Sequence, residues 1–197
     1  HTTTFGVGEL FLAALDAGAT HALLLLGGSA TNDAGAGMLQ ALGATLLDAQ
    51  GQPLPPGGGA LQQLATLDLS TLDPRLAELR VEAAVDVDNP LLGERGASAV
   101  FGPQKGATDA DVATLDRALG HFADLTAKAL GRDDRELPGA GAAGGMGFAA
   151  HCFLNATLTP GIEMIMQQAN VARLLNDADL VITGEGRLDG QSLAGKT

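Results

Sequence analysis

LLLLGGSATNDAGAG, at residues 23–37, predicts a buried strand, a turn and the start of a helix in immediate succession. The apolar run is long enough for one strand, and Gly27 and Gly28 end it. Backbone N–H groups at such a junction are exposed and can bind an anion. Side chains that add hydrogen-bonding groups or charge follow at Ser29, Thr31, Asn32 and Asp33. We interpret the stretch as a candidate anion site; in the alternative interpretation the glycines form only a tight turn and Asn32 or Asp33 caps the helix.

The composition is that of a glycine-rich globular protein with an acidic surface. Of 197 residues, 28 are glycine and 46% are hydrophobic, which is enough for a real core. The net charge is −12 with only 11 Lys and Arg, and no basic cluster occurs. This charge argues against nucleic acid or an anionic membrane as the main partner. Cys152 is the only cysteine, which excludes an internal disulfide and a cysteine-based zinc site and favours a small core residue.

The chain shows no targeting or membrane-spanning segment. Its longest wholly apolar run, residues 22–26, is too short to cross a bilayer, and no secretory signal is visible, so we expect a cytoplasmic protein. The sequence begins at His1 in the middle of a pattern and stops just after Gly195-Lys196. We therefore expect an excerpt of a longer protein.

Helix-like and strand-like segments alternate along the chain. Helical spacing of apolar residues predicts helices over 7–17, 35–42 and 111–130. Apolar runs predict strands over 22–26, 44–47, 81–87 and 179–183. The Pro- and Gly-rich residues 50–59 predict a surface loop or the seam of a hairpin. The alternation predicts an α/β fold with a mostly parallel or mixed sheet and flanking helices. Polar clusters at 27–33, 86–89 and 184–189 would then lie at the carboxyl ends of strands, where such folds bind ligands.

Two nucleotide-binding patterns occur without their usual context. GQSLAGKT (190–197) matches the Walker A pattern, but six residues separate it from the predicted strand before it. GAGAAG (139–144) matches a dinucleotide-binding pattern, but a charged loop precedes it rather than a strand. We interpret the second as a glycine-rich turn leading into a helix over about 148–154. Its amides at Gly144 and Gly145 remain candidates for a phosphate.

Five segments together resemble the bacterial type I glycerate kinases: GGSATNDAGAGMLQALGA (27–44), VEAAVDVDNPLLG (81–93), GASAVFGPQKGA (96–107), LPGAGAAGGMGFA (137–149) and DLVITGEGRLDGQSLAGK (179–196). The resemblance implies ATP-dependent phosphorylation of D-glycerate, typically at the 2-hydroxyl, with Mg²⁺. It also implies a two-domain fold in which one α/β domain is inserted into a flavodoxin-like domain. Residues 1–178 would be part of the inserted domain, and 179–197 the junction strand and motif that lead into the second domain. The family's Asp-Ser-Phe/Tyr-Lys and Ala-Asp-Gly-Gly-Glu-Gly segments are absent from this sequence, and the family does not use a Walker A loop.

Phosphoryl transfer needs a metal on the phosphates, cations or amides on the oxygens, and a group that orients the acceptor hydroxyl. We assign the role of the group that orients the acceptor hydroxyl to Asp189; its competing role is ligation of Mg²⁺. We assign the binding of an anionic group to Arg187; the alternative for Arg187 is a structural ion pair. The metal candidates are Asp86, Glu185 and Asp33. The alternative for Glu185 is a role in a turn. A charged Asp86 at the end of a buried strand would be costly without a partner, and the alternative to a metal contact is hydrogen bonds to loop amides.

The substrate or phosphate candidates share a small or polar character: Gly27, Gly28, Ser29, Thr31, Asn32, Lys105, Gly144 and Gly145. Lys105 lies in the tight sequence FGPQKG and is a candidate for a phosphate or carboxylate, with a solvated lysine as the alternative. No role is assigned to the four histidines. Two other functions stay open: a ligand-binding module without turnover, and a P-loop nucleotidase using residues 190–197.

Overall fold

The computed structural model describes residues 2–176 and 178–182 and is built on a three-stranded parallel sheet. Its strands are β1 (His21–Leu26), β4 (Arg80–Val85) and β5 (Thr157–Pro160), in the order β1-β4-β5. Leu24, Ala83 and Leu158 lie side by side across the sheet. The predicted α/β fold with a parallel sheet and flanking helices is confirmed.

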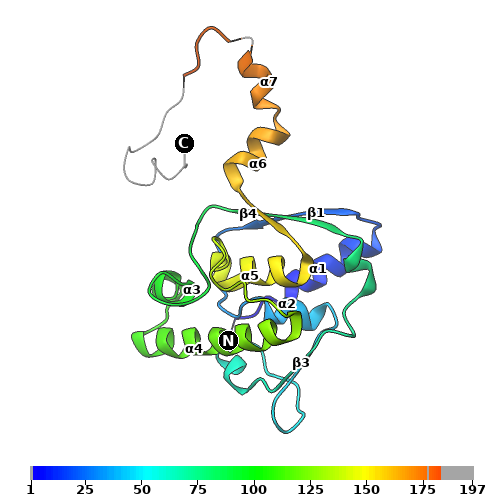
Figure 1. Ribbon diagram of the computed structural model, residues 1–197, viewed down its shortest axis with the longest axis vertical. Helices are drawn as coiled ribbons and strands as arrows, with labels where there is room; N and C mark the ends of the chain where they lie inside the picture. Colours follow the sequence, from blue (N-terminus) through cyan, green and yellow to red (C-terminus); the bar gives the residue numbers. More distant parts are fainter. Residues whose placement is uncertain (1, 177, 183–197) are drawn as a thin grey trace.

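Helices cover one face of this sheet, as Figure 1 shows. Helix α5 (Ala142–Leu154) contacts all three strands, and α1 (Phe5–Asp16) packs on α2 (Ala36–Ala41). The long helix α4 (Asp109–Leu130) packs on α5 and on the short α3 (Ala97–Phe101). Phe122 of α4 and Phe148 of α5 are fully buried and meet edge to face, with ring centroids 6.3 Å apart. The apolar side that the sequence predicts for α4 therefore forms the centre of the core.

A second, two-stranded antiparallel sheet lies at the far end of the core from the parallel sheet. It pairs β2 (Thr45–Leu47) with β3 (Thr66–Asp68), and the short helix η1 (Gly58–Gln63) lies between them in sequence. Leu46, Leu61 and Leu64 are each only 2% exposed and attach this sheet to the core. The predicted strand at 44–47 is confirmed. The predicted loop at 50–59 lies between the paired strands β2 and β3, and its last two residues, Gly58 and Gly59, belong to η1.

Helix α4 begins with a capping box, two residues before its predicted start. The Thr108 hydroxyl accepts a hydrogen bond from the Asp111 backbone N–H at 3.2 Å, and the Asp111 carboxylate accepts from the Thr108 N–H at 2.9 Å. The Thr108 hydroxyl also donates to the Asp111 carboxylate at 2.6 Å, and this bond, together with the one from the Thr108 N–H, holds the pKa of the Asp111 carboxyl below its usual value. The box satisfies N–H groups that a helix start otherwise leaves unpaired.

We predict that Thr108→Ala lowers the free energy of unfolding by about 1 kcal/mol, the usual cost of losing a side-chain cap. The measurement is urea denaturation followed by circular dichroism. Thr108→Ser is the control, because it keeps the accepting oxygen and should stay close to the wild type. Equal losses in both variants would contradict the capping role.

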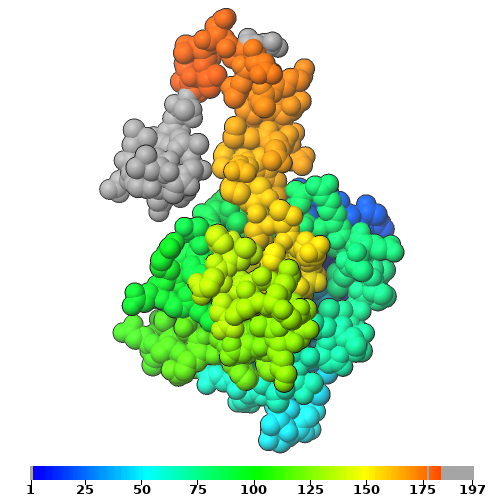
Figure 2. Space-filling view, in the orientation of Figure 1, coloured from blue at the N-terminus to red at the C-terminus, as the bar shows by residue number. Residues whose placement is uncertain are grey.

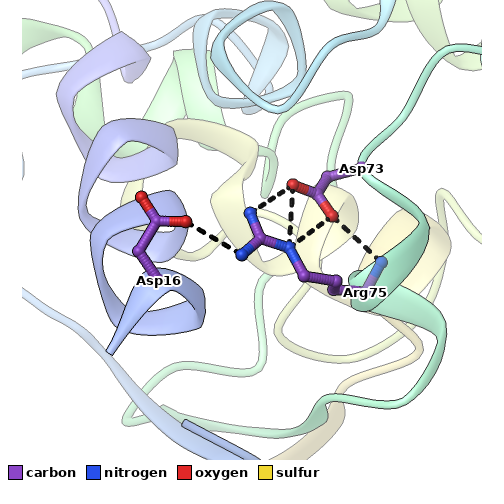
Figure 3. A network of polar contacts seen from close by, with 3 residues as sticks. All are labelled: Asp16, Asp73 and Arg75. Atoms are coloured by element: carbon purple, nitrogen blue, oxygen red, sulfur yellow. Dashed lines mark hydrogen bonds and ion pairs between the residues drawn. The ribbon is translucent and has the colours of Figure 1, made fainter. Parts of the chain in front are cut away.

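An ionic network joins α1 to the short helix η2 (Pro74–Ala77) near the amino ends of the parallel strands (Figure 3). The Arg75 guanidinium donates to Asp73 at 2.7 Å and to Asp16, the last residue of α1, at 2.8 Å. The hydrogen bonds from Arg75 hold the pKa of the Asp73 carboxyl below its usual value. A cavity of about 500 Å³ lies beside the network, lined by Arg80, Phe153 and other residues at this edge. Ligands of parallel α/β sheets bind at the opposite, carboxyl ends of the strands, so the position of this network favours a structural role.

The C-terminal part differs most from the prediction. Helices α6 (Gly161–Gln168) and α7 (Val171–Asn176), which the sequence did not indicate, project from the body (Figures 1 and 2). The predicted strand at 179–183 is wrong for its described residues, 179–182, which form none. Leu180 and Ile182 are 76% and 86% exposed. A strand requires a hydrogen-bonded neighbour, and no described strand lies beside this segment.

Within residues 2–176 and 178–182, no helix is both long and apolar enough to cross a membrane.

Candidate functional site

The site is organised around Lys105, which contacts the loop that follows β1. Its ammonium group donates to the Ser29 hydroxyl at 3.0 Å and to the Thr31 carbonyl at 2.6 Å. Lys105 ends the short helix η3 (Pro103–Lys105), 74 residues away from Thr31 in sequence. The structure thus brings together three of the residues that the sequence proposed for anion binding. Lys105 is half-buried and hydrogen-bonded rather than freely solvated.

The surroundings of Lys105 change the pKa of its amine. Burial lowers the pKa of its amine below the usual lysine value of 10.5, and the nearby negative charge of Asp33 opposes this shift. An ammonium group has three N–H donors, and Lys105 uses two of them on acceptors in the described part of the chain. The third donates to no acceptor within residues 2–176 and 178–182.

The backbone at Gly27 and Gly28 is open beside this lysine. Both glycines are exposed, and a Cβ atom added at either would meet nothing within 4 Å. The N–H groups of Gly28 and Ser29 donate to no described residue. Gly28 has φ of +60°, a left-handed conformation that turns the chain directly after the strand. Amides without a described acceptor, next to an ammonium group, are groups that can bind an anion, and the predicted anion site stays a prediction.

Asn32 and Asp33 lie below this surface and are buried. Asn32 is 9% exposed; its amide donates to the Ser98 hydroxyl at 2.9 Å, and its Oδ1 has no partner among the described residues. Asp33 is 1% exposed, and its carboxylate accepts from the Thr4 N–H at 2.8 Å and the Thr4 hydroxyl at 3.0 Å. It also accepts from two amides at the start of α2, those of Gly35 at 3.2 Å and Gly37 at 3.4 Å. Only the bonds from Gly35 and Gly37 resemble the capping interpretation, and the N-cap residue of α2 is Gly35 rather than Asp33. The metal role of Asp33 stays a prediction.

Gly144 and Gly145 support the loop from beneath. Their φ angles are +68° and +91°, which kinks the start of α5, and the Gly144 carbonyl accepts from the Ala34 N–H at 3.0 Å. A Cβ atom at Gly144 would lie 2.0 Å from the Thr31 carbonyl oxygen. The glycines therefore let α5 approach the loop closely, and their role toward a phosphate stays a prediction. Although α5 is bounded by Ala142 and Leu154, Ala143, Gly144 and Gly145 have non-helical backbone angles, so its regular helix starts only after Gly145, close to the predicted start near 148. A loop precedes the GAGAAG pattern, as the sequence indicated.

Asp86 follows β4 at the same, carboxyl edge of the sheet, but it is exposed. The expectation of a costly buried carboxylate was wrong, because β4 ends at Val85 and leaves the next side chain in solvent. Its Oδ1 accepts from the Gly161 N–H, the first residue of α6, at 3.1 Å. Asp86 thus accepts a hydrogen bond from a backbone amide, as the alternative interpretation expected, but this amide belongs to helix α6 rather than to a nearby loop. In the described ranges 2–176 and 178–182, no three His, Cys, Asp or Glu side chains cluster as metal ligands.

The remaining candidates lie outside the described residues: Glu185, Arg187, Asp189 and the Walker A pattern at 190–197. Their roles stay predictions.

Two residues of the site escaped the sequence analysis. Thr4 holds Asp33 and also accepts from the Met38 N–H at 2.9 Å, and Ser98 holds Asn32. Both act across long stretches of sequence, so no local pattern marks them.

Cys152 is buried as predicted; burial raises the pKa of its thiol to about 12, which makes it unreactive.

Comparisons with known proteins agree on one family. The whole chain, residues 1–197, matches the glycerate kinase family. It is 56% identical to a protein of Bacillus subtilis named glycerate kinase, covering 100% of this chain and 51% of that protein. It is 53% identical to a protein of Escherichia coli named glycerate 2-kinase, covering 99% of this chain and 51% of that protein. A crystal structure of a Salmonella typhimurium protein, provisionally named glycerate kinase 2, superposes with a TM-score of 0.88 at 54% identity, covering 99% of this chain and 52% of that one. The chain thus spans about half the length of these relatives.

Proposed function

The chain belongs to the glycerate kinase family, and we propose that it is part of an enzyme that phosphorylates D-glycerate with ATP to give 2-phosphoglycerate. The observation that carries the proposal is the Lys105 contact with the loop after β1, in a chain more than half identical to proteins named glycerate kinase. The relatives are about twice as long, so the activity belongs to a protein of their length. We propose that residues 1–178 form its inserted domain, and that 179–197 lead into a flavodoxin-like domain.

Lys105 and the free amides of Gly28 and Ser29 would bind one anionic group, either the carboxylate of glycerate or a transferring phosphate. Arg187 would hold a second anionic group, and Asp189 would accept the proton of the glycerate hydroxyl. When bound, Mg²⁺ neutralises phosphate charge. The exposed carboxylate of Asp86 fits it better than Asp33, whose two oxygens are occupied, and Glu185 is the third candidate. A reaction that consumes ATP and a small organic acid supports the cytoplasm as its location.

The test is a kinase assay on an enzyme of the relatives' length that carries this sequence, with D-glycerate, ATP and Mg²⁺. Phosphorus NMR of the product distinguishes 2-phosphoglycerate from 3-phosphoglycerate. Calorimetric titration of D-glycerate and of Mg·ATP, separately, into this chain then shows which ligand its residues bind. Binding without turnover in the longer protein would favour a ligand-binding module, and loss of nucleotide binding in Lys196→Ala would favour a P-loop nucleotidase.

We predict that affinity for the anion held by Lys105 falls as the pH rises, beginning below the usual lysine pKa of 10.5. The sign follows from the lowered pKa: the amine is charged below that pKa and binds an anion, and it loses its charge as the pH rises through it. Calorimetric titration between pH 7 and pH 10 measures the effect. Lys105→Arg is the control, because a guanidinium stays charged throughout this range. An identical pH profile in both proteins would contradict the prediction.

A further inference from the structure

The segment that carries Lys105 is fixed to the loop after β1 at two points. One is the Lys105 ammonium group on Ser29 and Thr31. The other is the hydrogen bond of 2.9 Å from the Asn32 amide to the hydroxyl of Ser98, in α3. Ser98 is 0% exposed, so this second contact is shielded from water.

A short and rigid path joins Ser98 to Lys105. The Ser98 carbonyl accepts from the Gly102 N–H at 2.9 Å, and the Gly102 carbonyl accepts from the Lys105 N–H at 2.9 Å. Gly102 packs tightly here, since an added Cβ would lie 2.3 Å from the Ser98 carbonyl oxygen. A displacement of α3 would therefore move Lys105 with it.

The orientation of Asn32 depends on Ser98. The amide nitrogen of Asn32 has its hydrogen bond with the Ser98 hydroxyl, and its Oδ1 has no partner among the described residues. Without the Ser98 hydroxyl, the buried side-chain amide of Asn32 would have an unpaired N–H group, which costs free energy in a site shielded from water. For the Asn32 amide to hydrogen-bond water instead, the loop would have to move away from α3.

We propose that Ser98 is a positioning residue: its hydroxyl orients Asn32 and holds the segment 97–105 so that Lys105 meets the loop at 27–33. The effect on ligand binding rests on the proposed function, whereas the effect on the two segments does not.

The test compares Ser98→Ala with Thr126→Val, which removes another buried hydroxyl, in α4, that has no described partner. Hydrogen exchange on this chain is the first readout. We expect Ser98→Ala to speed exchange of amides in 27–33 and 97–106 at least tenfold, and Thr126→Val to leave them unchanged. Unchanged exchange in Ser98→Ala would overturn the proposal. If that variant does not fold, Ser98→Cys, which keeps the volume but bonds weakly, should show the same local effect.

Ligand affinity in the longer enzyme is the second readout. We expect Ser98→Ala to weaken binding of the anion held by Lys105 about tenfold, and to have no further effect once Lys105 is replaced by Met. A loss that persists undiminished in the Lys105→Met background would show that Ser98 does not act through Lys105. If the wild-type enzyme binds neither D-glycerate nor Mg·ATP, the proposed function fails, and the exchange result alone still decides the positioning role.

Discussion

Lys105→Met is expected to weaken binding of one of the two substrates, D-glycerate or Mg·ATP, about 100-fold. The reason is the geometry of its ammonium group, which holds the loop through Ser29 and Thr31 and keeps one donor for a ligand. A charged hydrogen bond in a partly buried site contributes roughly 2–3 kcal/mol, and 1.4 kcal/mol is a factor of ten in affinity. Calorimetric titration of each ligand shows which of them carries the anion that Lys105 binds.

Lys128→Met is the matched control for this prediction. Lys128 lies near the end of α4 and is exposed. The variant therefore changes the net charge of the protein as much as Lys105→Met does, but it leaves the loop after β1 unchanged. It should leave both affinities within twofold of the wild type. Lys105→Arg should fall between the two variants, because it keeps the charge but not the compact ammonium group that fits between Ser29 and Thr31.

Two results would contradict the assignment of Lys105. The first is unchanged affinity for both ligands in Lys105→Met, which would make the lysine a purely structural tie of the loop. The second is an equal loss in Lys128→Met, which would show that only the overall charge matters. A thermal melt of each variant, followed by circular dichroism, checks that the fold is intact before affinities are compared.

The sequence predicted those parts of the fold whose signal is local. The apolar runs of β1 and β4 and the long amphipathic α4 are visible as periodic patterns. Strand β5 was missed because its four residues, TLTP, carry no run and end in proline. Residues 179–182 were predicted as a strand from an apolar run, but a run alone provides no neighbour to pair with.

The site shows the same division between local and tertiary information. The loop after β1 could be predicted because glycines and small polar residues directly follow an apolar strand. For Lys105 the sequence predicted only that it could bind an anion. Its contact with this loop could not be predicted, because 74 residues separate Lys105 from Thr31. Asp86 was placed in a buried setting because VEAAVDV reads as one apolar strand, whereas the strand stops at Val85. The roles of Ser98 and Thr4 could not be predicted, because no local sequence pattern indicates which distant residue a hydroxyl will hydrogen-bond.

Gly144→Ala is expected to destabilise the fold by roughly 3 kcal/mol or more, through two costs that add. The first is the left-handed backbone, with φ of +68°, which disfavours any side chain by about 1–2 kcal/mol. The second is a collision, since the new Cβ would lie 2.0 Å from the Thr31 carbonyl oxygen and 2.7 Å from the Asn32 Cα. Both atoms are backbone, so neither can rotate away, and the loop must move.

Gly131→Ala separates the two costs. Gly131 follows α4 with a φ of +71°, almost the same as that of Gly144, but an added Cβ there would meet nothing within 4 Å. It should lose only about 1–2 kcal/mol, the cost of the left-handed conformation. Urea denaturation gives both free energies of unfolding, and hydrogen exchange at 31–34 reports whether the loop has moved. Equal losses in the two variants would show that the loop yields at no cost, and that the packing of α5 does not hold the Lys105 site in place.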